Sequence, residues 1–286
     1  MSLARALWQF GEPVHAITYY APERREATDA LGLKGGWMSY FGCRAAPLGA
    51  ASAATVTAVF FNFHPKMVAR AIPDAWTYAS PTDLLDARIT SMDAALRRVL
   101  GDDVVESDAT RRAASLASAA VESCNMAGRP MGAANQAVAS PDEPHLALWQ
   151  ALTAIREHRG DGHVDALVSA GITPSEALVL QAASGRSPED GLRANRGWSD
   201  EEWDAAAEAL LSRGWIDDDR RVTASGTEIR DDVERDTERL AEPITTALGD
   251  ERAEELVSLL RPLAERVMTS GAVPMHNNMG VPWPPS

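Results

Sequence analysis

The stretch HLALWQALTAIREHRGDGHVDALVSAG, residues 145–171, decides how the rest of the chain is arranged. Its apolar positions recur at helical spacing, so we expect one long helix near the middle of the chain. The same stretch carries the densest polar cluster in an alanine-rich and leucine-rich background, namely Arg156, Glu157, His158, Arg159, Asp161 and His163. It therefore predicts both the joint between the two halves of the chain and one wall of a functional site.

The chain has 286 residues and a formal net charge of −14, and the excess negative charge lies in its second half. Residues 1–144 hold 13 Lys and Arg against 15 Asp and Glu, whereas residues 145–286 hold 14 against 26. An acidic body repels nucleic-acid phosphates and anionic membranes, which disfavours both as partners. Cys43 and Cys124 are too few for a disulfide framework, and no apolar run approaches the length of a membrane span. We therefore expect a soluble cytoplasmic protein.

The second half has the element order of a winged helix-turn-helix. Ser199 and Glu202 form a capping box at the start of a helix, and the run GWIDDDRRVT (214–223) places two short apolar runs around a polar turn. The run predicts a short β-hairpin, the wing. The helices expected around it cover residues 172–183, 199–213, 223–248 and 251–268.

The first half echoes this frame. Gly49 precedes Trp76 by 27 positions, and Gly171 precedes Trp198 by the same 27. We interpret the echo as an internal repeat, although chance similarity among helices rich in Ala, Gly and Leu is the alternative. The predicted fold is mainly α, with two fused winged-helix-like repeats: a degenerate one without a wing over 1–144, and one over 145–286 that adds the joining helix, the wing and a C-terminal tail.

Four segments resemble a family of actinobacterial proteins that carry a winged helix-turn-helix region and are distantly similar to MarR-type regulators. These segments are YFGCRAAPLG (40–49), FNFHPKMVARAIPDAW (61–76), REHRGDGHVDALVSAG (156–171) and GWSDEEWDAAAEALLSRGWI (197–216). The resemblance spans nearly the whole chain and implies the winged helix-turn-helix fold. It carries little information about chemistry, because a fold does not specify a function.

The expected recognition helix, 199–213, is acidic. Its charged residues are Asp200, Glu201, Glu202, Asp204 and Glu208 against a single Arg213. Residues that read the major groove are mostly Arg, Lys, Asn and Gln, with cations on the flanking phosphates. The residues thus argue against nucleic acid as a partner, even though the fold argues for it.

Aromatic and polar residues of the first half, together with arginines of the long helix, predict a ligand pocket. The predicted ligand-binding residues are Trp37, Tyr40, Phe41, Arg44, Asn62, Phe63, His64, Arg129, Arg156 and Arg159. For His64 the simpler interpretation is that it caps the helix that begins at Pro65. Haem ligation by His64 or His15 is conceivable, but no pattern makes it specific, so the cofactor is left open.

Acid–base chemistry is the alternative use of the long helix. His158, Asp161 and His163 are the candidate catalytic residues if the protein is an enzyme. The two histidines lie five positions apart rather than the four of a helical zinc motif, so we expect no metal. The competing interpretation is structural: Glu157, Asp161 and the neighbouring arginines form ion pairs that join the two halves.

From these patterns we expect a cytoplasmic small-molecule-binding protein, regulatory or accessory, with a ligand cleft between two winged-helix-like repeats. An enzyme that uses His, Asp and Arg residues of that cleft is the second hypothesis, and a DNA-binding transcriptional regulator is the third. The expected partner is a small-molecule ligand. Homo-oligomerisation is a further possibility that the sequence does not address.

Overall fold

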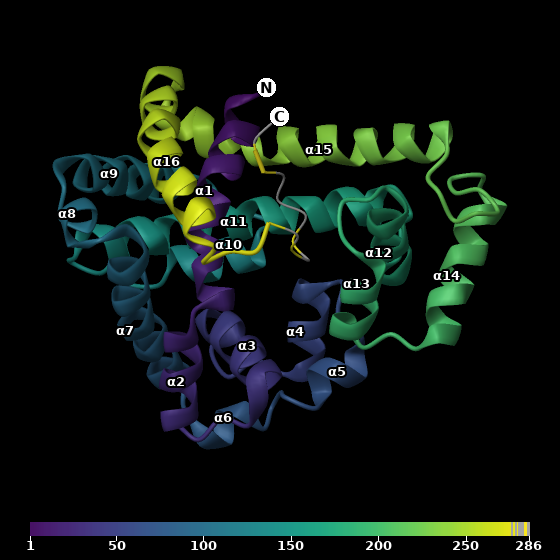
Figure 1. Ribbon diagram of the computed structural model, residues 1–286, viewed down its shortest axis with the longest axis horizontal. Coiled ribbons are helices and arrows are strands. Elements are labelled where there is room, and N and C mark those ends of the chain that lie inside the picture. Colours follow the sequence, from purple (N-terminus) through teal and green to yellow (C-terminus); the bar gives the residue numbers. More distant parts are fainter. Residues whose placement is uncertain (276, 278, 280–282, 285–286) are drawn as a thin grey trace.

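The computed structural model describes residues 1–275, 277, 279, 283 and 284, and this part of the chain is mainly helical (Figure 1). The prediction of a mainly α protein is confirmed. The helices of the first half are α1 (Leu3–Tyr20), α2 (Pro22–Ala30), α3 (Gly35–Ala45), the 3₁₀ helix η1 (Ala46–Leu48), α4 (Ala53–Phe60), α5 (Pro65–Ala69), α6 (Ala75–Tyr78), α7 (Pro81–Leu100), α8 (Asp102–Val105), α9 (Asp108–Ser123) and α10 (Pro130–Gln136). Those of the second half are α11 (Pro144–Ser169), α12 (Pro174–Ala183), α13 (Glu189–Arg196), α14 (Asp200–Ser212), α15 (Ala224–Leu248) and α16 (Asp250–Ser270).

The long central helix α11 confirms the expectation for residues 145–170. Its first half is buried on nearly every side, and neighbours must surround a helix of that kind. Helices α1, α9, α10 and α15 supply those neighbours, and Trp149 is completely buried among them. Figure 1 shows α11 and α15 running side by side across the molecule.

The largest hydrophobic core draws on both ends of the chain. It combines Phe10 of α1 and Leu96 of α7 with Trp149 of α11 and Leu260 of α16. A second core lies around α3 to α7, and a third joins α12, α14 and α15 around Trp203. The division into units 1–144 and 145–286 stays a prediction, and part of the C-terminal tail lies outside the described residues.

The predicted β-hairpin wing is wrong. Over the described residues the chain contains no β-strand, and the segment between α14 and α15 makes one isolated antiparallel bridge, Ile216 to Val222. The second strand of the predicted hairpin cannot extend, because Thr223 already N-caps α15 by accepting a hydrogen bond from the Gly226 amide. The first strand would have to begin directly after Gly214, which follows the end of α14 and has a φ of 69°. The protein therefore does not have the predicted fold of two winged-helix-like repeats with a wing in the second.

Three other segments refine the helix assignment. Residues 51–63 contain helix α4. The proline-containing segment 128–144 contains α10, and the polar segment before Trp198 contains α13. In both cases a proline at or next to the first helical position favours a short helix that local composition alone does not reveal.

A sharp corner joins α11 to α12. Gly171 there has a φ of 66°, which glycine adopts without the steric cost of a side chain. Thr173 then opens α12 with a capping box to Glu176. Across the described residues no single helix is long and apolar enough to cross a membrane; α11 and α12 together would be, but they bend by 99°.

Two glycines of α11 provide a test of the packing between α11 and α15. A Cβ on Gly162 would lie 3.1 Å from Leu240 Cβ of α15, whereas the nearest atom to a Cβ on Gly160 is 3.8 Å away, at the tip of Arg156. We expect Gly160→Ala to raise the free energy of unfolding by about 1 kcal/mol, the usual gain for a helix interior. We expect the free energy of unfolding of Gly162→Ala to be about 1–3 kcal/mol lower than that of Gly160→Ala, because the added methyl group overpacks against Leu240.

Urea denaturation followed by circular dichroism measures both variants. If Gly162→Ala is as stable as Gly160→Ala, close packing at Leu240 does not constrain α11.

Candidate functional site

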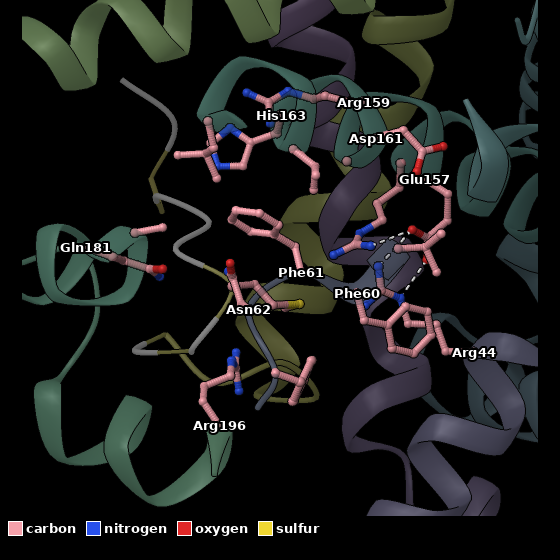
Figure 2. Close-up of a pocket in the computed structure, with 18 of the residues that line it drawn as sticks. Arg44, Phe60, Phe61, Asn62, Glu157, Arg159, Asp161, His163, Gln181 and Arg196 are labelled. Atoms are coloured by element: carbon pink, nitrogen blue, oxygen red, sulfur yellow. Dashed lines mark hydrogen bonds and ion pairs between the residues drawn. The ribbon is translucent and has the colours of Figure 1, made fainter. Parts of the chain in front are cut away.

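A cavity of about 670 Å³ lies where helices of the two halves meet. Helix α11 forms one wall through residues 156–167, and α12 and α15 contribute Gln181 and Arg230. The first half supplies residues of α1 and α3 and the segment 59–63 at the end of α4. Figure 2 shows Arg159 and His163 on α11 facing Phe61 and Asn62, with Arg44 on the far side. The cavity is thus bounded by segments that are far apart in the sequence.

A buried ion network closes one end of the cavity. The Arg44 guanidinium donates two hydrogen bonds to the Glu157 carboxylate, with N–O distances of 2.8 and 2.9 Å. Arg156 donates to the same carboxylate at 2.9 Å, and its Nε lies 3.5 Å from Glu12. Ion pairs therefore join the two halves through Glu157 and the arginines, because Arg44 belongs to α3 and Glu157 to α11. Asp161, which the structural interpretation also included, forms no ion pair among the described residues and instead accepts a hydrogen bond from the Gly132 amide.

Burial and neighbouring charge act in opposite directions on the two carboxyl groups of this network. Burial opposes ionisation of Glu157, but the guanidiniums of Arg156 and Arg44 outweigh it and hold the pKa of Glu157 well below its usual range. At Glu12 burial is the larger effect and raises the pKa. Glu12 Oε2 is also buried without a hydrogen-bond partner among the described residues. Glu157 is therefore the fixed negative charge, and Glu12 is the more easily protonated group.

Asp161 and His163 lie one helical turn further along α11. Asp161 accepts a hydrogen bond from the Gly132 amide at 2.9 Å, and burial raises its pKa to about 6. The Thr237 hydroxyl donates to the Val233 carbonyl, so it accepts from Nδ1 of His163 at 3.0 Å. Burial, with Arg159 adding to it, lowers the pKa of His163 to about 4. At neutral pH His163 is uncharged and Asp161 is mostly ionised.

Arginines dominate the charge of the cavity. In the described part of its lining they are Arg24, Arg44, Arg156, Arg159, Arg186, Arg196 and Arg230, against the acidic Glu12, Glu157, Asp161 and Glu234. Arg159 and Arg186 pair with Glu234, and Arg44 and Arg156 pair with Glu157. The cavity is therefore positive inside a protein of net charge −14.

Aromatic side chains form the opposite wall. Phe60, Phe61 and Phe63 border the cavity together with Trp37 and Tyr40. Phe61 has a φ of 43°, a value that a bulky residue rarely adopts and that costs backbone energy. Such strain persists only where the surrounding structure holds it, and it occurs often at ligand-binding segments.

The structure brings many of the predicted site residues to this cavity. Of the predicted ligand-binding residues, those that line it are Trp37, Tyr40, Arg44, Asn62, Phe63, Arg156 and Arg159. Of the candidate catalytic residues, Asp161 and His163 line it as well. Their roles in binding or catalysis stay predictions.

The other predicted residues lie elsewhere. Phe41 is completely buried in the second core, and Arg129 pairs with Asp165 at 2.6 Å. His64 caps α5 by accepting a hydrogen bond from the Lys66 amide, so the simpler interpretation of His64 is confirmed. His158 faces away from the cavity, with Nε2 3.7 Å from the thiol of Cys124, and burial lowers its pKa to about 4.

Neither candidate haem ligand has an uncommitted imidazole nitrogen. His15 bonds to Thr153 and Tyr19, each at 3.0 Å. His64 uses Nδ1 for its cap and places Nε2 3.1 Å from Glu202. In the part of the chain that the structure describes, no three His, Cys, Asp or Glu side chains are grouped to hold a metal ion.

Several lining residues were missed by the sequence prediction. Glu12 and Gln181 each interrupt an apolar helical run, and that interruption is a usable signal for an inward-facing polar group. Arg186 follows α12 in a polar connection, where nothing distinguishes it from a solvated arginine. The missed polar and charged residues are Glu12, Tyr19, Tyr20, Arg24, Gln181, Arg186, Asn195, Arg196, Arg230 and Glu234.

The connection between α13 and α14 is docked on the cavity wall. The Trp198 indole donates to the Asn62 carbonyl at 2.9 Å, and the amide of His64 donates to the Arg196 carbonyl at 2.9 Å. The His64 ring meets the Trp198 ring edge-on at 4.8 Å. The segment that lines the cavity thus also holds the turn between the two helices.

The sequence model of a helix-turn-helix family matches residues 4–274. The chain belongs to that family. The helix-turn-helix family membership supports the coarser part of the resemblance seen in the sequence, whereas the MarR likeness and the actinobacterial origin stay predictions. No curated protein and no solved structure matches the chain.

The ion network at the end of the cavity predicts a large difference between two carboxylates. Glu157→Gln leaves the charges of Arg44 and Arg156 buried with less compensation, so we expect a loss of about 3–5 kcal/mol in the free energy of unfolding. Glu255 forms a similar two-bonded pair with Arg112, but on the surface, where water and salt screen it.

Glu255→Gln is therefore the matched control and should leave stability nearly unchanged. Urea denaturation at neutral pH measures both variants. Equal, small losses would show that the Glu157 network does not hold the two halves together.

Proposed function

We propose that the protein is a helix-turn-helix protein that binds an organic anion with an apolar body in the cavity between its two halves. One observation carries the proposal: an arginine-rich cavity of about 670 Å³ lies inside a chain of net charge −14. A positive interior is costly unless something negative occupies it. Its volume falls within the range typical of small-molecule sites, about 300–1,000 Å³.

The chemistry of the lining supports an anion with an aromatic or aliphatic body. Planar guanidinium groups bind carboxylates, sulfonates and phosphates through charge-assisted hydrogen bonds. The wall formed by Phe60, Phe61 and Phe63 supplies apolar surface for the rest of the ligand. Guanidinium groups and aromatic rings border the same space, with Arg44 over the Phe60 ring and Arg196 over the Phe63 ring. A ligand with a charged end and an apolar body therefore fits better than an inorganic ion.

Arg230 is the arginine best placed to bind the charged end. It projects from α15 into the cavity and is half-buried. Within the described residues no carboxylate lies at ion-pair distance from it, whereas Arg44, Arg156 and Arg159 are engaged by Glu157 and Glu234. Burial, together with the like charge of Arg186, lowers the pKa of Arg230, so an anion at this point relieves both effects.

We assign the helix–turn–helix to α13 and α14. Ligand binding would act on these two helices through the segment 61–64. Phe61, Asn62 and Phe63 line the cavity, and Asn62 and His64 hold Trp198 and the end of α13. A ligand that favours one arrangement of this segment shifts the position of α13 and α14 by its differential affinity for the two arrangements. The proposal therefore assigns the protein a regulatory or accessory role.

A DNA-binding regulator, including the MarR-like type, is the second candidate function, and family membership favours it. The N-terminal end of a recognition helix normally contacts base edges. In α14 that end carries Asp200, Glu201 and Glu202, and Glu202 lies 3.1 Å from His64 of the first half. Base contact would require both neutralisation of these carboxylates and release of that end from the first half.

The fluorescent aromatic sulfonate 1-anilinonaphthalene-8-sulfonate tests the first proposal, because it combines an anion with an apolar body. We expect saturable binding of one molecule per chain to the folded protein. Arg230→Gln should weaken binding about ten-fold or more, as expected for loss of a hydrogen bond between charged groups. Fluorescence titration measures the dissociation constants.

Arg235→Gln, on the same helix but with its side chain exposed and paired to Asp232, is the matched control and should bind like the parent protein. Near-ultraviolet circular dichroism of both variants verifies that they are folded. The proposal is wrong if the parent protein does not bind the probe, or if the Arg230 and Arg235 variants bind it equally.

Gel retardation of mixed genomic DNA fragments at about 50 mM salt distinguishes the two candidate functions. We expect no retardation by the ligand-free protein, because the carboxylates at the start of α14 repel phosphate. Retardation that weakens steeply as salt increases would instead support the DNA-binding regulator.

A further inference from the structure

A second, much smaller cavity lies behind the Arg44–Glu157 pair. Its volume is about 20 Å³, enough for one water-sized particle. Among its lining residues are Arg24 of α2, Arg44 of α3, Arg88 of α7, Tyr19 of α1 and Asn135 of α10. Its lining thus comes from α11 and from the helices packed around it, and Arg24 and Arg44 also border the large cavity.

Two of its arginines are not matched by a carboxylate. Arg88 is 5% exposed, and its hydrogen bond is to the Cys43 carbonyl at 3.3 Å, with its guanidinium over the Trp149 ring. Arg24 donates to the Ser39 hydroxyl at 2.5 Å, and its Nε is buried without a hydrogen-bond partner. Throughout the described residues, no carboxylate lies at ion-pair distance from either guanidinium. Burying such a charge without compensation is strongly unfavourable.

The neutral groups around the cavity do not supply the missing negative charge. Burial raises the pKa of the Cys43 thiol and of the Tyr19 hydroxyl, so both stay protonated at neutral pH. Glu157 lines the cavity, but its two oxygens already accept from Arg44 and Arg156. The three arginines of the cavity therefore face one carboxylate that a fourth arginine shares.

We propose that this small cavity binds a single halide ion, held by the guanidiniums of Arg24 and Arg88 beside Arg44. A volume of about 20 Å³ admits a monatomic anion and excludes sulfate, phosphate and carboxylates. The Oδ1 atom of Asn135, an unpartnered acceptor, borders the same cavity. It would repel the ion, which therefore lies toward the arginine side.

The halide site is distinguished from the organic-anion site by Arg88, which lines the small cavity alone, and by Arg230, which lines the large cavity alone. Arg24 and Arg44 border both cavities. By joining α2 to α7 across the end of α3, the ion would raise the free energy of unfolding. It would not respond to the organic ligand. Stability is accordingly the property to measure.

Bromide is the probe, because it replaces chloride and scatters X-rays anomalously. The full chain is dialysed into sodium gluconate, and bromide is then added at constant ionic strength. We expect a saturable rise in Tm of about 5 °C at roughly 100 times the dissociation constant. Sulfate at the same ionic strength should not reproduce the rise.

Arg88→Met keeps the length of the side chain, removes its charge and should abolish the bromide response. Arg111→Met, which removes an exposed arginine of α9, should respond like the parent protein. Arg230→Gln should also keep the response, and this separates the halide site from the large cavity. An equal response from Arg88→Met and the parent protein would overturn the proposal.

Crystals of the parent protein grown in bromide decide the matter even if Arg88→Met does not fold. An anomalous peak between Arg24 and Arg88 is expected. Density there without anomalous signal would mean that the cavity holds only water, and the halide site would be rejected.

Discussion

The buried pair between Arg44 and Glu157 is the interaction on which the rest of the structure depends. It joins α3 of the first half to α11 of the second, and both its partners are withdrawn from water. Charges in such a position need near-complete hydrogen bonding, and Arg156 and Glu12 extend the network for that reason. The network separates the large cavity from the small one, so both proposed sites depend on its geometry.

The sequence predicted the central helix well, because the signal is local. Apolar residues recur at helical spacing over residues 146–155, and that pattern specifies a helix whatever its neighbours are. The prediction of the wing was wrong for a reason that is also local. Thr223 is the N-cap of α15 in addition to being the end of the expected strand, and the helix prevails because it buries Val233 and Ile244.

The candidate site could be predicted only in part. Arg44, Arg156 and Arg159 were identified because they stand beside aromatic or helical patterns that predict inward orientation. The sequence could not predict which of Phe60, Phe61 and Phe63 face the cavity. The direction of the Phe61 side chain depends on an unusual backbone angle rather than on the helical period. Arg230 lies in a helix rich in charged residues, where only its position in the cavity wall distinguishes it from its neighbours.

The packing of α1 against α16 has a consequence for how the protein reaches its native state. These two helices are in direct contact although nearly the whole chain separates them, and both belong to the largest core. Contacts between such distant segments form late, because closing a long loop is entropically costly. During synthesis, α11 and α15 can cover part of α1 as they emerge, but the side of α1 that carries Phe10 lies against Arg261 of α16 and stays exposed until α16 is made. The nascent chain therefore presents an apolar helix for most of its translation, the kind of segment that chaperones shield from aggregation.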